Sequence, residues 1–471
     1  MNTIKQIQNQ YENKQIKVSD YISSLIKNNQ TKDTNLNAFI SHTSQLALEQ
    51  AQKLDQEIAQ DSSIIKSKPL FGIPIALKDI FLVQGTLTTA ASQVLSNYQA
   101  QYSSTVWQRL SDAGAICIGK LNCDAWAHGS SGENSQFGPT HNPWNPDYVP
   151  GGSSSGSAVA IASQMATVSM GSDTGGSIRL PASFCNVVGL KPTYGRVPRY
   201  GVISMASSLD SIGHFTQTVE DSAIVLSVTA GQDPYDASTS PAPISLYHKD
   251  LTLPKRKLKI GIPKEYIDQG LDQEVVRVFE EVKAVFNQQL DCEIVSVSLP
   301  HTQYGIAVYY IIQTSEVSSN LGRYDGIRYG LKRDLFGDEA KRRIMLGTYV
   351  LSAGHHDAYY TKAQQVRTLI KQDFDTVFQN VDALIAPVSP TPPFKLSSKS
   401  ADPMQMYLSD ILTVTINLAG VPSISIPGGF SSSHLPIGFQ IIGPHLSEQL
   451  LFQLGHAYQQ QTSWHTQTPT L

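Results

Sequence analysis

Residues 171–179 (GSDTGGSIR) place a candidate nucleophile, Ser177, directly after two glycines. The consecutive backbone amides of Thr174, Gly175 and Gly176 could converge on the negatively charged oxygen that develops when a serine attacks a carbonyl group. Glycine also lets the backbone approach a substrate closely. A Gly-Gly-Ser turn caps a helix more often than it catalyses, and a serine needs a base before it can attack. The segment is therefore a catalytic candidate only if a base lies elsewhere in the chain.

The best-placed base is Lys78, at the end of the short apolar strand predicted over residues 72–79 (GIPIALKD). A lysine that is removed from water has a lowered pKa and can accept a proton as a neutral amine. Most lysines at strand ends are solvated charges, so Lys78 alone is weak evidence. The residue counts do not exclude a Ser-His-Asp catalytic unit. However, no histidine follows a nucleophile-elbow pattern (Gly-x-Ser-x-Gly) in a suitable context.

Residues 151–157 (GGSSSGS) have the composition of a flexible linker. Linkers normally have polar neighbours, whereas this segment runs directly into an apolar helix predicted over residues 157–166 (SAVAIASQMA). Its second half would then lie at a helix N-terminus, where Ser and Gly cap free amides and can bind anions. For this segment alone, both interpretations stay open.

Two further patterns resemble binding motifs but are assigned to ordinary structure. Residues 114–121 (GAICIGKL) space two glycines and a lysine like a phosphate-binding loop, but Leu121 stands where that loop needs a hydroxyl group. His355 and His356 are adjacent on a predicted helix, so their side chains point in different directions, and no metal-ligand spacing supports them. We expect neither a nucleotide site nor a metal site in this chain.

The composition predicts a soluble, reduced globular protein. Hydrophobic residues make up 41% of the 471 residues, which supplies a substantial core. A net charge of −4 argues against a protein whose whole surface binds nucleic acid, but it does not exclude a local patch that faces tRNA. Four scattered cysteines form no disulfide framework. The chain shows no signal peptide and no apolar stretch of about 18 residues, so we expect a cytoplasmic protein without a membrane span; an organellar matrix is the alternative.

The candidate residues must be positioned by the elements around them. Apolar residues recur near the helical period over residues 1–60, which predicts N-terminal helices. Strands and helices alternate over residues 70–200, which predicts an α/β sheet covered on both faces. Three later apolar segments are expected to join the same sheet: residues 382–388 (DALIAPV), 423–427 (SISIP) and 436–443 (PIGFQIIG).

The domain organisation is predicted to be simple. Residues 268–380 are expected to be mostly helical. No internal repeat or long linker interrupts the chain, so we expect a single domain over residues 1–471, with the catalytic core segments in residues 70–230.

Lys78, the Gly-Gly-Ser-Ser segment at residues 151–154 and the Asp-x-Gly-Gly-Ser segment at residues 173–177 together resemble the amidase signature family, in which the two serines are 24 residues apart, as they are here. The resemblance implies one α/β/α domain with a large mixed sheet. It also implies a Ser–cis-Ser–Lys mechanism, in which Lys78 draws a proton through Ser153 and so activates Ser177. The peptide bond that precedes Ser153 would be cis. Ser177 would form an acyl-enzyme with loss of ammonia.

Within that family, five further segments resemble the A subunits of the amidotransferases that act on Glu-tRNA(Gln) or Asp-tRNA(Asn). They are GLKPTYGRVPRYGVI (189–203), ASSLDSIG (206–213), SSNLGRYDGIRYG (318–330), KRRIMLGTYVLSAGHHDAYYTKAQQVRTLI (341–370) and YLSDILTVTINLAGVPSISIP (407–427). The resemblance implies that Arg343 holds the α-carboxylate of glutamine and Asp410 its α-ammonium, with Tyr309 lining the same pocket. Arg342 competes with Arg343 for this role, and Asp410 would otherwise be a surface or capping residue.

The same resemblance implies a division of labour within a larger assembly. This chain would hydrolyse glutamine and pass ammonia through an internal channel to a partner protein, which acts on ATP and misacylated tRNA. A small third protein would brace the pair. ATP and Mg²⁺ are expected on the partner, and no cofactor is expected in this chain.

Two other functions stay open. One is a stand-alone amidase that hydrolyses another amide by the same chemistry, and the other is a catalytically silent assembly subunit, which the intact Lys78, Ser153 and Ser177 disfavour. The chain departs from the family pattern near its site in two places. Ser155 stands where glycine is expected, and the segment at residues 329–341 is shorter than expected.

Overall fold

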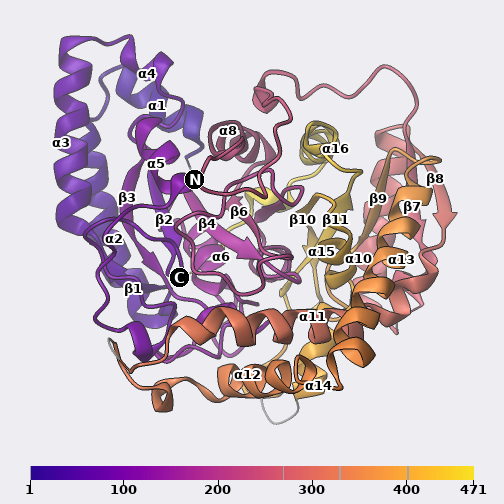
Figure 1. The fold of residues 1–471 in the computed structure, drawn as a ribbon. Coiled ribbons are helices and arrows are strands. Elements are labelled where there is room, and N and C mark those ends of the chain that lie inside the picture. Colours follow the sequence, from indigo (N-terminus) through magenta and orange to yellow (C-terminus); the bar gives the residue numbers. More distant parts are fainter. Residues whose placement is uncertain (1, 269, 328–329, 400–402, 471) are drawn as a thin grey trace.

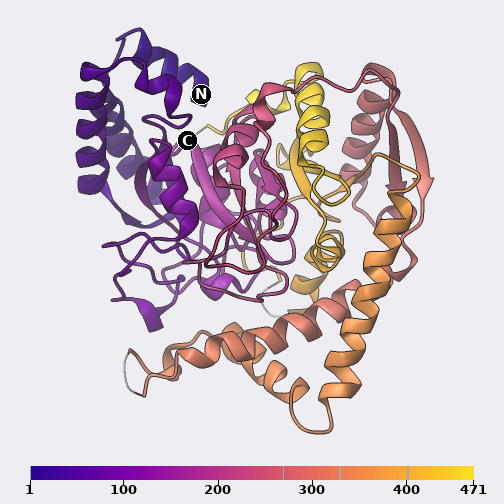
Figure 2. The same ribbon diagram turned by 45° about the horizontal axis from the view of Figure 1, so that its top comes forward.

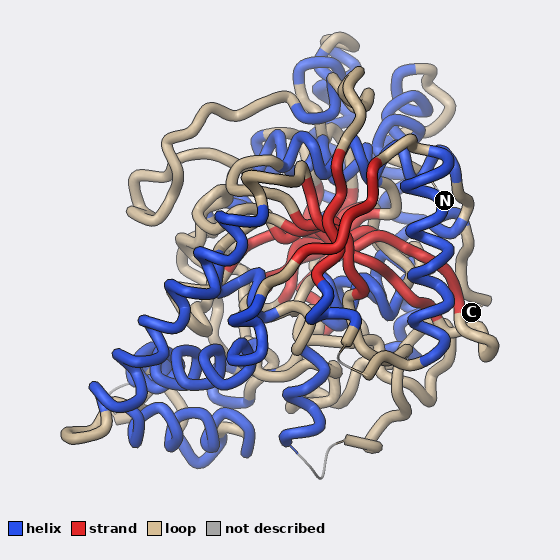
Figure 3. Tube along the Cα trace, turned by 90° about the vertical axis from the view of Figure 1, so that its right-hand side faces the viewer, coloured by secondary structure: helices blue, strands red, loops and turns tan. Residues whose placement is uncertain are grey.

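An eleven-stranded mixed sheet runs through the computed structural model, which describes residues 2–268, 270–327, 330–399 and 403–470. Its strands follow one another across the sheet in the order β1-β3-β2-β4-β6-β5-β10-β11-β9-β7-β8 (Figures 1 and 3). Their bounds are β1 Phe39–His42, β2 Pro74–Lys78, β3 Ile116–Leu121, β4 Val168–Asp173, β5 Val188–Lys191, β6 Ser211–Thr216, β7 Lys259–Pro263, β8 Glu293–Val297, β9 Ala383–Pro387, β10 Ser423–Phe430 and β11 Pro436–Ile442.

Helices cover both faces of this sheet. On β11, Gly438 lies against Ser183 of α7, whereas Ile426 of β10 lies against Gly455 of α16. Gly438 pairs with Pro427, the neighbour of Ile426, and successive residues of a strand face opposite sides, so α7 and α16 pack on opposite faces. The α-helices of the described residues are α1 Ile4–Glu12, α2 Val18–Leu36, α3 Ser44–Gln60, α4 Ile64–Ser67, α5 Thr105–Asp112, α6 Ser155–Ala162, α7 Arg179–Cys185, α8 Val219–Thr229, α9 Lys264–Ile267, α10 Gln273–Ala284, α11 Gly305–Asn320, α12 Asp338–Val350, α13 Lys362–Val377, α14 Pro403–Tyr407, α15 Val414–Ala419 and α16 Glu448–Gln461. None of these helices is long and apolar enough to cross a membrane.

The pairing of β2 with β4 brings two predicted site segments together. Both strands are buried along their whole length, as is typical of parallel strands covered on two faces. They run parallel, with Leu77 opposite Met170. Lys78 at the end of β2 therefore lies at the same sheet edge as the end of β4, where the Gly-Gly-Ser turn begins.

The helices α11 to α13 form an arm at one side of the molecule, beyond the sheet (orange in Figure 2). Gly347 of α12 has no room for a side chain, because a Cβ atom there would meet the backbone of Thr314 on α11. This close approach fixes α12 on α11. It also fixes the two residues of α12 that matter below, Glu339 and Arg343.

The observed fold confirms the predicted α/β sheet with helices on both faces. Four of its strands, β1, β6, β7 and β8, lie outside the segments predicted to form strands. β1 interrupts the expected N-terminal helices and pairs antiparallel with β3, and β8 interrupts the helical region at Glu293–Val297. Residues 328–329, at the start of the shortened segment, lie outside the described residues.

A buried ion pair fastens β3 to the loop after β2. Lys120 is fully buried, and its Nζ donates to Asp79 Oδ1 at 2.9 Å and to Thr88 Oγ1 at 2.9 Å. Asp79 is also fully buried. Such a pair is costly to break from one side, because the remaining charge stays buried without its partner.

We therefore expect Lys120→Met to lower the free energy of unfolding by about 3–5 kcal/mol. Urea denaturation measures this loss. Lys257→Met is the matched control, because Lys257 pairs with Asp291 at the exposed surface, where ion pairs contribute at most about 1 kcal/mol. Equal losses for the two variants would contradict the structural role of Lys120.

Candidate active site

Lys78 is fully buried and surrounded by serine hydroxyl groups. Its Nζ donates to Ser153 Oγ at 2.7 Å, to Ser154 Oγ at 3.0 Å and to Ser172 Oγ at 3.0 Å. No carboxylate of the described residues lies within ion-pair distance of it. Burial therefore lowers the pKa of Lys78 from its ordinary value, since nearby carboxylates act only from a distance. A lysine in this setting can act as a neutral base.

Ser153 follows a cis peptide bond, as the resemblance implied. Asp124 holds the segment: its backbone amide donates to Ser153 O at 3.2 Å, and its carboxylate fills the place where a side chain on Gly152 would lie. The helix α6 begins two residues later, at Ser155. The segment GGSSSGS is thus a buried helix start, and the linker interpretation is wrong.

Ser177 lies in the turn between β4 and α7, and it is 8% exposed. Its hydroxyl group has no hydrogen-bond partner among the described residues, so it is free to rotate toward Ser153 or a substrate. The Gly176 amide donates to Asp173 Oδ1 at 2.9 Å. The amides of Thr174 and Gly175 donate to no described acceptor, so these two are the freer oxyanion donors of the predicted three.

A buried ion pair shapes this turn. Arg179 donates to both oxygens of Asp173, at 3.0 Å each, and also to Asn417 Oδ1 and Gln440 Oε1. Burial alone would raise the pKa of Asp173, but the charge and hydrogen bonds of Arg179 outweigh it and lower the pKa to about 2. Asp173 is therefore ionised at neutral pH.

A pocket of about 290 Å³ contains Arg343, Glu339 and Ser130. Arg343 is 3% exposed, and its guanidinium carbon lies 5.4 and 5.8 Å from the ring centroids of Tyr310 and Tyr407, which stack on each other. Its Nε donates to Glu339 Oε1 at 2.8 Å, whereas its two terminal nitrogens donate to no described acceptor. Those two nitrogens are in the arrangement that binds a carboxylate bidentately.

Arg342, the competitor of Arg343, occupies a different position. Its side chain is 43% exposed and pairs with the other oxygen of Glu339. The structure thus places Arg343 inside the pocket and Arg342 at its rim.

Asp410 and Tyr309 approach the same turn as Ser177. Asp410 Oδ1 lies 3.5 Å from the place of a Cβ atom on Gly176, and the ring of Tyr309 occupies the corresponding place at Gly175. Ser130 donates to Asp410 Oδ2 at 2.6 Å, and burial raises the pKa of Asp410 to about 7. Asp410 and Tyr309 therefore lie beside the turn of the candidate nucleophile, and Arg343 lines the pocket that contains Ser130, the donor to Asp410.

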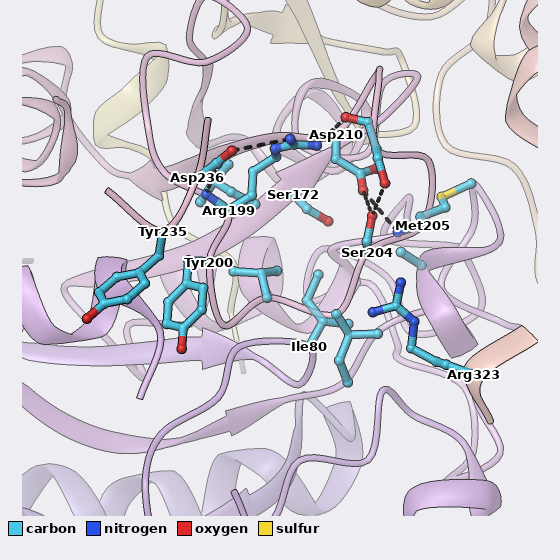
Figure 4. Close-up of a pocket in the computed structure, with 15 residues that line it drawn as sticks. Ile80, Ser172, Arg199, Tyr200, Ser204, Met205, Asp210, Tyr235, Asp236 and Arg323 are labelled. Carbon is cyan, nitrogen blue, oxygen red and sulfur yellow. Dashed lines mark hydrogen bonds and ion pairs between the residues drawn. The ribbon is translucent and has the colours of Figure 1, made fainter. Parts of the chain in front are cut away.

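Lys78 also contacts a second pocket, of about 240 Å³, through Ser172 (Figure 4). Asp210 lies in its wall and accepts hydrogen bonds from Ser204 and the Met205 amide. Arg199, paired with Asp236, lines another part of it. This pocket is polar and adjoins the lysine from the side of β4.

Several residues of the site are not marked by the sequence. Ser172 stands between a predicted strand and the Asp-x-Gly-Gly-Ser segment, and Ser154 stands within the Gly/Ser segment; neither position indicates a contact with Lys78. Ser130 and Glu339 belong to no motif, although Glu339 stands four residues before Arg343 on a predicted helix, where side chains meet.

The two rejected motifs have ordinary structures. Residues 116–121 form β3, so the glycines at 114 and 119 belong to a strand and its approach. His355 packs on Tyr349 and Tyr359, and His356 pairs with Asp357 at the surface. In the described ranges, no group of three or more His, Cys, Asp or Glu residues is arranged to hold a metal ion.

Comparison with known proteins shows the family to which the chain belongs. The profile of the family described as Amidase matches residues 20–452, and the chain belongs to this family. The chain is 50% identical to the A subunit of the glutamyl-tRNA(Gln) amidotransferase of Trichlorobacter lovleyi, over 100% of this chain and 99% of that protein. It is 48% identical to the corresponding protein of Geobacter metallireducens, over 99% and 98%.

Solved structures give the same result. The crystal structure of the A subunit of the glutamyl-tRNA(Gln) amidotransferase from Thermotoga maritima is 38% identical and superposes with a TM-score of 0.80, over 97% of this chain and 93% of that one. The peptide amidase from Stenotrophomonas maltophilia is 28% identical, with a TM-score of 0.82, over 98% and 96%.

Among the described residues, the hydrogen-bond partners of Lys78 are serine hydroxyl groups and no carboxylate. We therefore predict that its amine contributes to the reaction of Ser177 and little to the free energy of unfolding. We expect Lys78→Met to change the free energy of unfolding by less than about 1 kcal/mol, because no buried counter-ion loses its partner. Labelling of Ser177 by a fluorophosphonate should slow by about 100-fold or more, the usual contribution of a general base. A stability loss as large as that expected for Lys120→Met, or unchanged labelling, would contradict this role.

Proposed function

We propose that this chain is the glutamine-hydrolysing A subunit of a tRNA-dependent amidotransferase. The observation that carries the proposal is that the turn of Ser177 lies between a lysine–serine pair and a charged binding pocket. Lys78 donates to Ser153, and the amide of the next residue, Ser154, donates to Ser177 O at 3.2 Å. On the other side Asp410 lies beside Gly176, and its donor Ser130 lines the same pocket as Arg343. A catalytic unit beside such a pocket suits the side-chain amide of a free amino acid. Similarity over the full chain to proteins named as the A subunits of glutamyl-tRNA(Gln) amidotransferases supports the same function.

The proposed reaction begins with neutral Lys78, which accepts a proton from Ser153 while Ser153 accepts one from Ser177. Ser177 Oγ then attacks the side-chain amide carbon of glutamine, and the amides of Thr174 and Gly175 stabilise the oxyanion. The C–N bond breaks as the proton returns through Ser153 to the nitrogen, which leaves as ammonia. A water molecule deprotonated by the same relay then releases glutamate and restores Ser177.

Substrate orientation follows from the two charged residues. Arg343 would take the α-carboxylate through its two free terminal nitrogens, and Asp410, when ionised, would take the α-ammonium group. Tyr309, packed against Gly175, would close the wall of the pocket next to the oxyanion donors.

The released ammonia would leave through the pocket of Figure 4, because Ser172 both contacts Lys78 and lines that pocket. In this proposal the ammonia reaches a partner protein that uses ATP and Mg²⁺ to amidate misacylated Glu-tRNA(Gln) or Asp-tRNA(Asn). A small third protein braces the two, and this chain needs no cofactor of its own.

The direct test is ammonia release from L-glutamine by the purified chain, alone and with its partner proteins, ATP, Mg²⁺ and Glu-tRNA(Gln). We expect release that rises with the partners and tRNA and falls by at least about 10³-fold in Ser177→Ala. Release from unrelated amides, indifferent to glutamine and partners, would instead indicate a stand-alone amidase. No Ser177-dependent release in either setting would indicate a catalytically silent assembly protein.

The assignment of the carboxylate-binding arginine is tested by two neighbouring variants. Lysine at position 343 keeps the charge but loses the bidentate geometry, so Arg343→Lys should raise KM for glutamine by about 10–100-fold, as expected for lost hydrogen bonds to a charged group. Arg342→Lys is the matched control at the rim of the pocket, and its KM for glutamine should stay within about twofold of the unsubstituted value. Equal effects would contradict the assignment.

A further inference from the structure

The side chain of His128 is a buried polar group that the proposed mechanism does not use. It is fully buried and lines the same pocket as Arg343, Glu339 and Ser130. Neither of its ring nitrogens has a hydrogen-bond partner among the described residues. An imidazole without partners is costly to bury, so its presence in the wall of a binding pocket indicates that a ligand supplies the missing partner.

The backbone around His128 is held independently of the ring. Trp126 and Ala127 have positive φ values of 59° and 61°, a conformation that a bulky residue such as tryptophan rarely adopts. The Trp126 ring packs between Tyr324 and Phe336, at 4.9 and 5.1 Å, and thereby keeps this segment in place. Backbone strain that is fixed by its surroundings in this way is frequent at ligand-binding sites.

His128 itself is anchored through its main chain. Its amide donates to Ala125 O at 3.0 Å, and its carbonyl oxygen accepts from Asn134 Nδ2 at 2.7 Å. The imidazole therefore lies in the wall of the pocket without making a hydrogen bond of its own to the described residues.

The charge state of the ring follows from its surroundings. Burial, together with the positive charge of Arg343, lowers the pKa of His128 well below its ordinary value. At neutral pH the ring is neutral, with one N–H donor and one acceptor nitrogen.

Arg343, which lines the same pocket, indicates which chemical group of a ligand His128 would bind. Arg343 and His128 line the same pocket of about 290 Å³, so a carboxylate bound by Arg343 would share that pocket with the unpartnered imidazole. In the proposed function Asp410, whose carboxylate is oriented by Ser130, takes the α-ammonium group on the same carbon, which leaves the carboxylate for Arg343 and a further donor.

We propose that His128 is a substrate-binding residue that donates a hydrogen bond to the α-carboxylate of the amino acid bound by Arg343. This inference rests on the proposed glutaminase function and adds a second donor to its carboxylate site. It makes His128 a determinant of specificity for α-amino acid amides over amides that lack the carboxylate.

The test compares His128→Met with His128→Gln. The two side chains are similar in length, but only glutamine can donate a hydrogen bond. We expect His128→Met to raise KM for L-glutamine by about 10-fold or more, with kcat within about twofold, because a hydrogen bond to a charged group is lost. His128→Gln should recover at least part of this loss. Calorimetric titration of L-glutamine into the Ser177→Ala background measures the same change in Kd without turnover.

A second substrate separates recognition from a structural role. 4-Aminobutanamide is glutamine without its carboxylate, so its hydrolysis by Ser177 should be slow and should not change in His128→Met. An unchanged KM and Kd for glutamine, or equal losses with both substrates, would overturn the role of His128 while the glutaminase function stands. Wild-type protein that neither binds nor hydrolyses glutamine would overturn the proposed function, and the carboxylate role of His128 with it.

Discussion

The buried ion pair of Asp173 and Arg179 holds the candidate active site together. Two charges that are fully removed from water are stable only when their remaining hydrogen-bonding groups are satisfied, and here they are. The carboxylate accepts the amides of Gly176 and Ile178, and the guanidinium reaches Asn417. The turn that carries the nucleophile is thus fixed by charge-assisted hydrogen bonds from both sides, and its position does not depend on the substrate.

The two neighbouring strands β2 and β3 each carry a fully buried lysine, but the two lysines have different hydrogen-bond partners. Lys120 lies opposite Leu77, so it shares the sheet face of Leu77, while Lys78 points to the other face. Lys120 meets a carboxylate and fastens the fold. Lys78 meets only hydroxyl groups, which accept its hydrogen bonds without compensating its charge. The difference in partner, and not in burial, makes one lysine structural and the other a candidate base.

The catalytic unit was predictable from sequence because local motifs place each member at a strand end or a turn. The parallel pairing of β2 and β4 brings Lys78 to the turn of Ser177, and Ser153 joins them through its own segment, which is held by the Asp124 amide before α6. Ser172 was not predictable as a lysine partner, since a serine inside a buried strand is consistent with simple packing. The strand β1 was missed because four residues at a sheet edge carry little periodicity.

The choice between Arg342 and Arg343 likewise needed the structure. Both stand on one predicted helix, and only the packing of α12 on α11 shows which of them is buried. The position of the ion pair has a consequence for how the protein is made. Arg179 donates to Gln440 on β11, which is 261 residues further along the chain. The hydrogen bonds that fix the nucleophile turn can therefore be completed only after β11 has been synthesised and has joined the sheet.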